Sequence, residues 1–387
     1  MKILHCCLAG LYTDDYGYQE NIMPKMHKLQ GHDVYILAST KIWLKGSKIG
    51  YTNPKSYHTK EGIPITRMSY IKWIPTYISS KLRIFRGIEK YLLCLQPDII
   101  FIHDVQFLSI VSFANYARTY NSTRIYVDNH SDFVNSARNI ISKYILHKII
   151  YKYCAKTIEP YTRKFYGTLP IRVDFLEKMY NLPEQKLEIL LMGFDHTLID
   201  LSVKNIIHHN IRKKYNISSN DFLIVTGGKI DKLKNIHILI KAFNELDNLN
   251  IKLLIFGSLL NDVRNDIEGM LVHSKNVIYI DWQSSIEIYK IFLASDLAIF
   301  PGRHSVLWEQ AVGLGLPCIF KRWHGHQHVD IGGNCLFIDD VNEMTIKEIL
   351  IHVIKNTDLY QKMKLIASEK GNKEFSYYEI SKYAIEL

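Results

Sequence analysis

Residues 297–320, LAIFPGRHSVLWEQAVGLGLPCIF, contain the alternation that decides the fold. The two apolar runs at its ends, 297–300 and 317–320, show no polar alternation, which is typical of strands buried on both faces of a sheet. Between them a Pro-Gly-Arg-His-Ser loop leads into a helical run that ends at Gly-Leu-Pro. The stretch therefore predicts a strand, a helix and a second strand parallel to the first.

The same alternation extends along the chain. Strands are expected at 2–9, 33–39, 98–103, 124–130 and 187–193, and again at 222–228, 251–258, 276–281 and 335–339. Helical runs lie between several of them, at 19–29, 81–94, 235–246 and 284–294. Parallel strands of this kind need helices on both faces of their sheet.

With 387 residues the chain is too long for one core. Two α/β halves predict two Rossmann-like domains whose parallel sheets face each other across a cleft. We expect an N-terminal domain at residues 1–200 and a C-terminal domain at residues 201–370. Residues 371–387 form a last helix, which could pack back on the N-terminal domain.

Composition places the chain among ordinary globular proteins, because 47% of its residues are hydrophobic and 22% are charged. The sequence contains no run of eighteen apolar residues, so it predicts no membrane-spanning helix. The first residues, MKILHCCLAGLY, predict a buried strand rather than a signal peptide, because Thr13, Asp14 and Asp15 interrupt the apolar run. Six scattered cysteines favour a reducing cytoplasm over a disulfide framework or a zinc site.

Positive charge is concentrated in residues 41–90, which hold eleven Lys and Arg but two acids. Trp, Tyr and Phe are interleaved with the basic residues. Three interpretations stay open: an ordinary solvated surface, a surface for anionic lipid headgroups, and a nucleic-acid surface. No recognised nucleic-acid motif supports the third.

Two segments at strand ends predict an anion site, because ligands of parallel α/β sheets bind at the carboxyl ends of the strands. In GGKIDKLKNIH (227–237), Lys229 follows a Gly-Gly turn and Lys234 precedes a helix. The loop at 301–306 opens a helix, whose free N–H groups near Ser305 and Val306 could bind a phosphate. These features predict a diphosphate site, with Arg303 as either a further contact or a surface residue. The alternative is that both lysines are merely solvated.

Five segments together resemble glycosyltransferase family 4 of the GT-B type, from bacterial capsule, O-antigen or exopolysaccharide clusters. They are GYQENIMPKMHKLQGHDVYIL (17–37), PDIIFIHD (97–104), VDNHSDF (127–133), GKIDKLKNIHILIKAF (228–243) and EQAVGLGLP (309–317). The resemblance covers nearly the whole chain, with Lys229 in the place of the family's arginine.

The resemblance implies a retaining transferase that moves a sugar from a nucleotide diphosphate donor, for which we expect UDP, without a metal or other cofactor. Catalytic roles fall to His130, Lys229, Lys234 and Glu309. His130 would lie near the anomeric centre and Glu309 would hold the donor ribose. Donor contacts fall to Gly17, Gly228, Trp282, Arg303, His304, Ser305, Val306 and Gln310, and the acceptor side to Tyr18, His103 and Asp128. Trp282 is either a stacking partner of the base or a core residue.

Two departures from the family pattern concern the donor site. Family members usually carry two glutamates eight residues apart, but Pro301 stands eight residues before Glu309. The first glutamate normally contacts the transferred sugar, and His304 and Ser305 could replace it. The usual register from Pro317 gives Gln310 rather than Glu309. Neighbours on a helix differ in direction by about 100°, so one of the two faces the ribose, and we expect Glu309.

The run WHGHQHVD (323–330) places His324, His326 and His328 at alternating positions. On an extended segment they would share one side, which is a pattern for a metal. We expect instead a polar loop beside the cleft, since no matching cluster of metal ligands accompanies the three histidines. His5 and His103 could likewise be ordinary buried histidines.

We expect a cytoplasmic enzyme bound peripherally to the inner face of the plasma membrane through residues 41–90. Its acceptor would be a lipid-linked glycan of surface polysaccharide synthesis. Two further hypotheses stay open, a nucleotide-sugar 2-epimerase of the GT-B type and a non-catalytic GT-B-like binding protein. A nucleic-acid partner is not expected, and the oligomeric state is not predicted.

Overall fold

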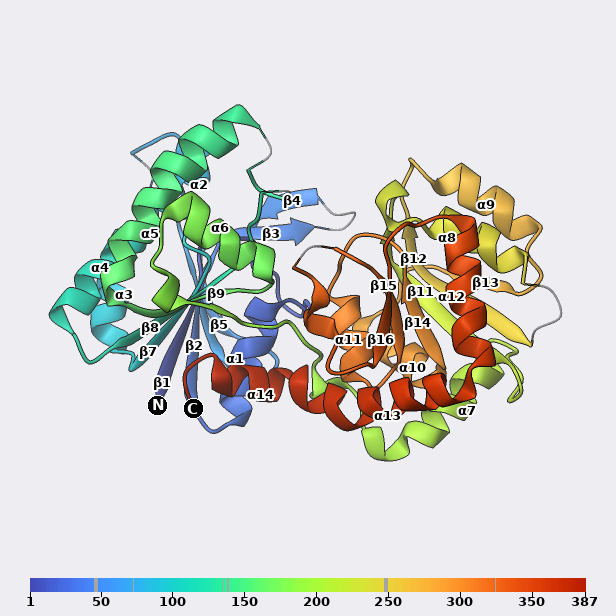
Figure 1. Ribbon diagram of the computed structural model, residues 1–387. Helices are drawn as coiled ribbons and strands as arrows, with labels where there is room; N and C mark the ends of the chain where they lie inside the picture. The colour runs from blue at the N-terminus through green and yellow to red at the C-terminus, as the bar shows by residue number, and fades with distance from the viewer. Residues whose placement is uncertain (45–47, 72, 134, 138, 247–249, 324) are drawn as a thin grey trace. The chain divides into compact units, whose positions relative to one another are not determined.

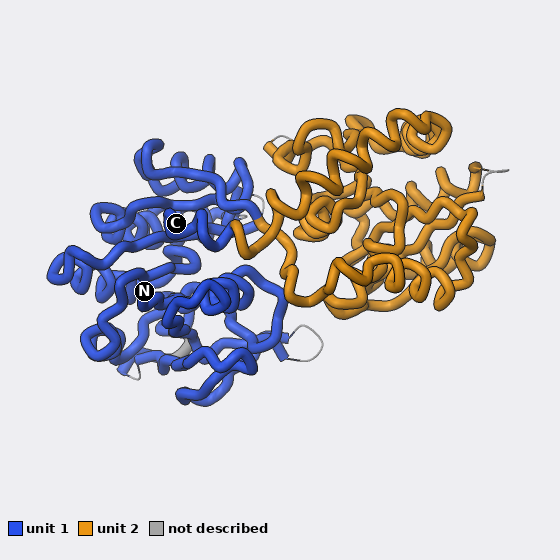
Figure 2. The backbone as a smooth tube through the Cα atoms, turned by 90° about the horizontal axis from the view of Figure 1, so that it is seen from below, with its two compact units in different colours: residues 1–191, 380–387 blue, residues 192–379 orange. Residues whose placement is uncertain are grey.

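The computed structural model describes residues 1–44, 48–71, 73–133, 135–137, 139–246, 250–323 and 325–387. The chain forms two compact units, coloured separately in Figure 2. Unit 1 contains residues 1–191 and 380–387, and unit 2 contains residues 192–379. The division thus falls after Leu191 instead of residue 200, and the return to unit 1 begins at Ile380 instead of residue 371.

Unit 1 is built on an eight-stranded sheet of order β10-β9-β8-β7-β1-β2-β6-β5, in which β5 alone is antiparallel to its neighbour (Figure 1). The strands are β1 (Lys2–Cys7), β2 (Asp33–Ser39), β5 (Ser56–His58), β6 (Pro64–Met68), β7 (Ile99–His103), β8 (Arg124–Asn129), β9 (Thr162–Gly167) and β10 (Leu187–Ile189). A separate antiparallel pair joins β3 (Lys41–Leu44) to β4 (Lys48–Tyr51).

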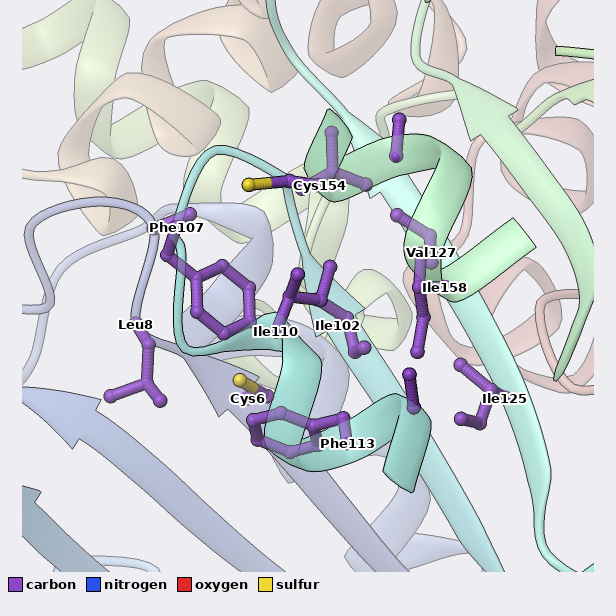
Figure 3. Packing of buried hydrophobic residues seen from close by; sticks show 14 of the residues in the cluster. Cys6, Leu8, Ile102, Phe107, Ile110, Phe113, Ile125, Val127, Cys154 and Ile158 are labelled. Atoms are coloured by element: carbon purple, nitrogen blue, oxygen red, sulfur yellow. The ribbon is translucent and has the colours of Figure 1, made fainter. Parts of the chain in front are cut away.

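The helices of unit 1 are α1 (Gln19–Leu29), α2 (Thr76–Leu82), α3 (Ile88–Leu95), α4 (Ile110–Thr119), the π-helical η1 (Ile141–Tyr151) with its continuation α5 (Lys152–Ile158), and α6 (Pro170–Tyr180). The last helix, α14 (Tyr377–Tyr383), begins in unit 2 and ends in unit 1. Figure 3 shows how Ile110 and Phe113 of α4 and Cys154 and Ile158 of α5 pack on the strands.

Unit 2 is built on a six-stranded parallel sheet of order β13-β12-β11-β14-β15-β16. Its strands are β11 (Phe222–Ile230), β12 (Ile251–Leu259), β13 (Val277–Ile280), β14 (Leu297–Phe300), β15 (Cys318–Lys321) and β16 (Cys335–Ile338). Its helices are α7 (Lys204–Lys214), α8 (Ile236–Asn244), α9 (Arg264–Val272), α10 (Ser285–Ala294), α11 (Leu307–Gly313), α12 (Glu343–Lys355) and α13 (Thr357–Glu374), with short 3₁₀ turns η6 (Lys232–Lys234) and η7 (Gln327–Val329).

These two sheets, parallel except for β5, confirm the predicted α/β class with two Rossmann-like units. Most core strands and helix α1 lie where the hydrophobic pattern predicts them. The helix expected over 81–94 is wrong, because Arg83 and Gly87 adopt positive φ values of 54° and 88° and separate α2 from α3. The strand expected over 187–193 ends at Ile189.

Candidate functional site

In unit 1 the predicted residues His103 and Asp128 lie side by side, because β7 and β8 pair in parallel with these two residues in register. Nδ1 of His103 donates to Oδ2 of Asp128 over 2.8 Å, and Nε2 of Gln19 donates to the same oxygen over 3.1 Å. His130, just beyond β8, places its Nε2 3.7 Å from Oδ2. The carboxyl ends of two neighbouring strands thus bring a carboxylate and two imidazoles together.

The charges of this cluster depend on one another. Burial raises the pKa of Asp128, but the two histidines outweigh it and hold that pKa well below the usual range. Burial lowers the pKa of His130, yet the Asp128 carboxylate leaves it above its ordinary value. Asp128 is therefore an ionised acceptor beside a histidine that readily holds a proton, an arrangement suited to a hydroxyl-bearing ligand or to general acid–base chemistry.

Three buried polar atoms of this cluster have no hydrogen-bond partner among the described residues. They are Oε1 of Gln19, Oδ1 of Asp128 and Nε2 of His130. Unsatisfied buried polar atoms are rare in folded proteins and call for a ligand or water. Two acceptors and one imidazole nitrogen match the hydroxyl groups of a sugar.

A chain of histidines continues from Asp128 into the core. Nε2 of His103 lies 3.1 Å from Nδ1 of His5, whose Nε2 lies 2.9 Å from Nδ1 of His27. Nε2 of His27 donates to the carbonyl oxygen of Ser381 over 2.9 Å. Burial lowers the pKa of His5 and lowers that of His27 to about 4, so both rings are neutral. His5 is the buried histidine that the sequence predicts, but it is part of a hydrogen-bonded relay.

The carbonyl of Ser381 fixes the protons along this chain, because a carbonyl can only accept. The His27 proton is on Nε2, so its Nδ1 accepts from Nε2 of His5. The bare Nδ1 of His5 then accepts from Nε2 of His103. Nδ1 of His103 faces an ionised carboxylate and also carries a proton. In this arrangement both ring nitrogens of His103 act as hydrogen-bond donors.

The predicted loop residues Gly17 and Tyr18 are exposed, and the ring of Tyr18 stacks on that of Tyr16 at 5.5 Å. They precede helix α1, whose first residue Gln19 contacts Asp128. The loop therefore directly precedes Gln19, the residue of α1 that contacts Asp128.

In unit 2 the predicted Gly-Gly turn is wrong, because β11 continues through both glycines to Ile230 and leaves Lys229 exposed within the strand. Gly228 pairs with Gly257 of β12. A Cβ on Gly257 would lie 1.9 Å from the carbonyl oxygen of Gly228, and Gly257 has a φ of 134°. The close approach of the two strand ends therefore requires glycine at 257.

Lys234 is the most unusual cation of unit 2, because it is 7% exposed at the end of η6. Its Nζ donates to the carbonyl oxygen of Arg303 over 2.8 Å. No ion pair to Lys234 is seen in the part of the chain that the structure describes. Burial lowers its pKa to about 8, with the nearby Arg303 charge acting in the same direction. A buried ammonium without a paired anion is costly, so this position suits an anionic ligand.

Arg303 is about half exposed, and its guanidinium pairs with Asp231 at 2.5 Å. It is thus neither a free surface residue nor an unpaired phosphate ligand. The expected helix at Ser305 and Val306 begins later, at Leu307, and α11 is only seven residues long. The hydroxyl of Ser305 is buried without a hydrogen-bond partner among the described residues.

Glu309 is fully buried and accepts two hydrogen bonds on the same oxygen. Nε2 of His304 lies 2.7 Å and Nε2 of His328 lies 2.8 Å from Oε1 of Glu309. Burial raises the pKa of this carboxyl, but the two histidines hold it well below the usual range. Oε2 of Glu309 has no partner in the described residues. The carboxylate is therefore ionised and keeps one acceptor for a ligand.

His304, Glu309 and His328 are also the set in unit 2 whose chemistry could hold a metal ion, since their ligand atoms lie within 4.8 Å of one another. The three alternating histidines of residues 323–330 therefore do not act as one set of ligands. His328 contacts Glu309, and the ring of His326 lies 5.3 Å from that of His304. The remaining member, His324, lies outside the described residues.

The other predicted donor contacts differ in exposure. Gln310 is buried beside Glu309 in α11, whereas Trp282 is 60% exposed just after β13. Trp282 is therefore not a core residue. Pro301, in the place of the first family glutamate, accepts a hydrogen bond from Asn235 on its carbonyl oxygen.

Sequence reasoning missed three residues of these clusters. Gln19 and His27 lie on α1, where the apolar pattern marks them only as helical, and their role depends on the pairing of β1, β7 and β8. Asp231 is the counter-ion of Arg303, a partner 72 positions later that no local pattern reveals.

Comparison with known proteins gives the context of this geometry. The family model described as "Glycosyl transferases group 1" matches residues 208–370. The glycosyltransferase MJ1607 of Methanocaldococcus jannaschii is 22% identical over 148 residues, which are 36% of this chain and 37% of that protein. The chain thus aligns with little more than a third of this relative's length.

Solved structures match over nearly the whole chain. Anabaena HepE in complex with UDP has a TM-score of 0.68 at 13% identity, covering 100% of this chain and 99% of HepE. WaaG, a glycosyltransferase involved in lipopolysaccharide biosynthesis, has a TM-score of 0.63 at 14% identity, with 99% and 98% coverage. A Listeria monocytogenes protein described as a putative UDP-N-acetylglucosamine 2-epimerase has a TM-score of 0.61 at 12% identity, with 98% and 94% coverage.

These matches confirm the predicted resemblance to GT-B glycosyltransferases and support a transferase enzyme, while membership of family 4 stays a prediction. Residues 208–370 thus match the group 1 glycosyltransferase family, and the chain has the GT-B fold of the solved structures that it resembles.

Proposed function

We propose that this protein transfers a sugar from a UDP-sugar, with retention of anomeric configuration, to a lipid-linked glycan of surface polysaccharide synthesis. The observation that carries the proposal is the buried, unpaired ammonium of Lys234 at the carboxyl edge of β11. HepE binds UDP and UDP-glucose, and WaaG acts in lipopolysaccharide biosynthesis, which supports the donor and acceptor classes proposed here.

In this proposal Lys234 stabilises the charge that develops on the departing diphosphate, with exposed Lys229 as a second cation. A preorganised cation at a leaving group typically contributes ~3–4 kcal/mol to the transition state. The free oxygen Oε2 of Glu309 accepts from the donor ribose, and His304 and His328 orient that carboxylate. Trp282 stacks on the base.

In this proposal the polar cluster of unit 1 binds the sugar. The unsatisfied atoms of Gln19, Asp128 and His130 bind sugar hydroxyls, and His130 lies near the anomeric centre of the transferred sugar. Tyr18 lies on the acceptor side, and the loop at Gly17 contacts the donor. No metal is required for turnover in this proposal, so activity persists after dialysis against EDTA.

The proposal is tested by incubating the protein with UDP-sugars and a lipid extract of membranes, following labelled sugar into the lipid fraction. The anomeric configuration of the product, read by NMR, tests retention. Donor converted to an epimer without any glycan product would favour the 2-epimerase, whose fold the chain also matches. Nucleotide binding without turnover on any acceptor would favour a non-catalytic protein.

A further inference from the structure

The helical segment of residues 139–158 in unit 1 has an apolar face that none of the described residues of its unit covers. Six large side chains on it are exposed: Ile140, Ile141, Tyr144, Ile145, Ile149 and Tyr153. Two of the most exposed are Ile140, at 76%, and Ile149, at 63%. They recur at intervals of four residues along η1 and α5, so they share one face of the helix. Contiguous exposed apolar surface of this kind marks an interaction site.

The opposite face of the same segment is firmly anchored. Tyr151, Cys154, Ala155 and Ile158 are buried in the core of unit 1, where Figure 3 shows Cys154 and Ile158 against the strands. Nδ1 of His147 lies 2.9 Å from the hydroxyl of Tyr180 on α6. The helix is therefore apolar on two faces, of which the core uses one.

The charge around the exposed face identifies its partner. Residues 139–158 contain four lysines and no acid, and Glu159, the next residue, pairs with Lys156 at 3.3 Å. Lys148 and Lys156 are exposed, and the Nζ atoms of Lys143 and Lys148 both lie 5.5 Å from the ring centre of Tyr144. An apolar helix face flanked by lysines and bordered by tyrosine is the pattern of a helix that lies in the interface of an anionic bilayer.

A second segment contacts the buried face of this helix. The hydroxyl of Tyr151 donates to the carbonyl of Lys81 in α2 over 3.5 Å, and Arg83 lies over the Tyr151 ring at 5.6 Å. Ile78 of α2 is exposed, and Trp73, just before α2, is 83% exposed. The tryptophan and the helix thus belong to neighbouring segments of one unit.

Two arginines of the basic stretch 41–90 are bound within the protein, whereas the exposed basic residues described there are Lys48, Lys55, Lys60, Lys81, Arg86 and Lys90. Arg67 is buried and donates to the carbonyl oxygens of Tyr12 and Ser39, and Arg83 donates to Gln106. The membrane contact expected for this stretch stays a prediction.

We propose that the apolar face of residues 140–153, with Lys148 beside it, docks unit 1 onto an anionic lipid bilayer. The proposal deepens the proposed function, on which its link to a lipid-linked acceptor rests. Lipid binding itself is measured without donor or acceptor, so the two can fail separately.

The experiment is flotation of the full chain with vesicles of phosphatidylcholine mixed with phosphatidylglycerol, and with phosphatidylcholine alone. Binding is expected on the anionic vesicles. The variant I145S/I149S is expected to lower the partition coefficient by roughly a hundredfold, since each buried isoleucine contributes about tenfold. Lys148→Glu should weaken binding by at least about fivefold, because one basic residue near an anionic surface is worth ~1 kcal/mol.

The matched controls are Val272→Ser and Leu365→Ser, which remove exposed apolar side chains from α9 and α13 of unit 2. They are expected to bind vesicles as the wild type does. Circular dichroism and the thermal midpoint of each variant confirm that it is folded. Equal binding of I145S/I149S and wild type would overturn the proposal. So would a dimer that this variant abolishes in sedimentation while vesicle binding persists, since the face would then be a contact between copies of this chain.

Discussion

At the scale of single residues, Lys234 links burial to function. A lysine with a pKa of about 8 is protonated below that pH and neutral above it. We expect affinity for UDP to be highest below pH 8 and to fall as the pH rises through about 8. Lys234→Arg, whose guanidinium stays charged, should flatten this profile. Calorimetric titrations across pH 6.5–9.5 at constant ionic strength check both expectations, with the buffer range chosen around a pKa of about 8. A wild-type profile as flat as that of the arginine variant would contradict the role of Lys234.

The histidine relay gives a second prediction at this scale. In ¹⁵N-labelled protein at neutral pH, His103 should show the shifts of a doubly protonated ring, while His5 and His27 show neutral rings protonated on Nε2. His27→Phe removes the donor to Ser381 and the acceptor for His5. We expect it to shift the His103 resonances although the two rings do not touch. A neutral His103 in the wild type would refute the proton assignment.

At the scale of elements, the junction of β11 and β12 depends on glycine. Gly257→Ala should destabilise the fold by more than ~1 kcal/mol, because the new Cβ meets the Gly228 carbonyl at 1.9 Å and the residue keeps a positive φ. Gly269→Ala is the matched control, since it lies within α9 with nothing within 4 Å of its Cβ. It should stabilise the protein by ~0.5–1 kcal/mol. Urea unfolding of both variants measures the difference, and similar midpoints would contradict the close approach.

The sequence predicts elements well where periodicity is strong and poorly where tertiary contacts decide. Helix α1 and the apolar core strands follow their hydrophobic pattern. Strand β9, TRKFYG, is polar in its first half and is held by its pairing with β8. Strand β6 contains Arg67, which is buried because three elements supply its acceptors. Neither strand has a pattern that a local window could detect.

The sequence likewise predicts some residues of the candidate site and misses others. The resemblance marks His103, Asp128, Lys234 and Glu309, and the structure places each at or just after a strand end or within a buried cluster. The Gly-Gly turn is wrong, because strand β11 is longer than the sequence suggests, and α11 begins at Leu307, directly after Val306. The phosphate contact expected at Ser305 and Val306 stays a prediction. The partners of these residues come from distant positions and required the fold.

At the scale of the whole molecule, the last eight residues complete unit 1. Ser381 accepts from His27, and the hydroxyl of Tyr126 donates to Glu386 over 2.7 Å. Ala384 and Ile385 are fully buried. Truncation after Glu379 should lower the thermal midpoint, since burial of one isoleucine alone contributes ~1.5–3 kcal/mol. Removal of Leu387 alone, which is 60% exposed, is the control and should leave the midpoint unchanged. Equal midpoints for the two truncations would contradict this role of the C-terminus.

The molecule also separates two tasks between its units. Among the described residues, no helix is long and apolar enough to cross a membrane. The proposed lipid contact lies in unit 1, and the buried lysine and the ionised Glu309 lie in unit 2. Vesicle binding and nucleotide binding should therefore respond to different variants.

The most direct test of the central claim is a calorimetric titration of the protein with UDP, GDP and ADP at fixed salt. Wild type, Lys234→Ala and Lys232→Ala are compared, because Lys232 is an exposed lysine of the same 3₁₀ turn. We expect UDP to bind and Lys234→Ala to weaken it by roughly ten- to a hundredfold, the range for a lost charged hydrogen bond, with little change in Lys232→Ala. No nucleotide binding by the wild type, or equal affinity in all three proteins, would contradict a diphosphate site at Lys234.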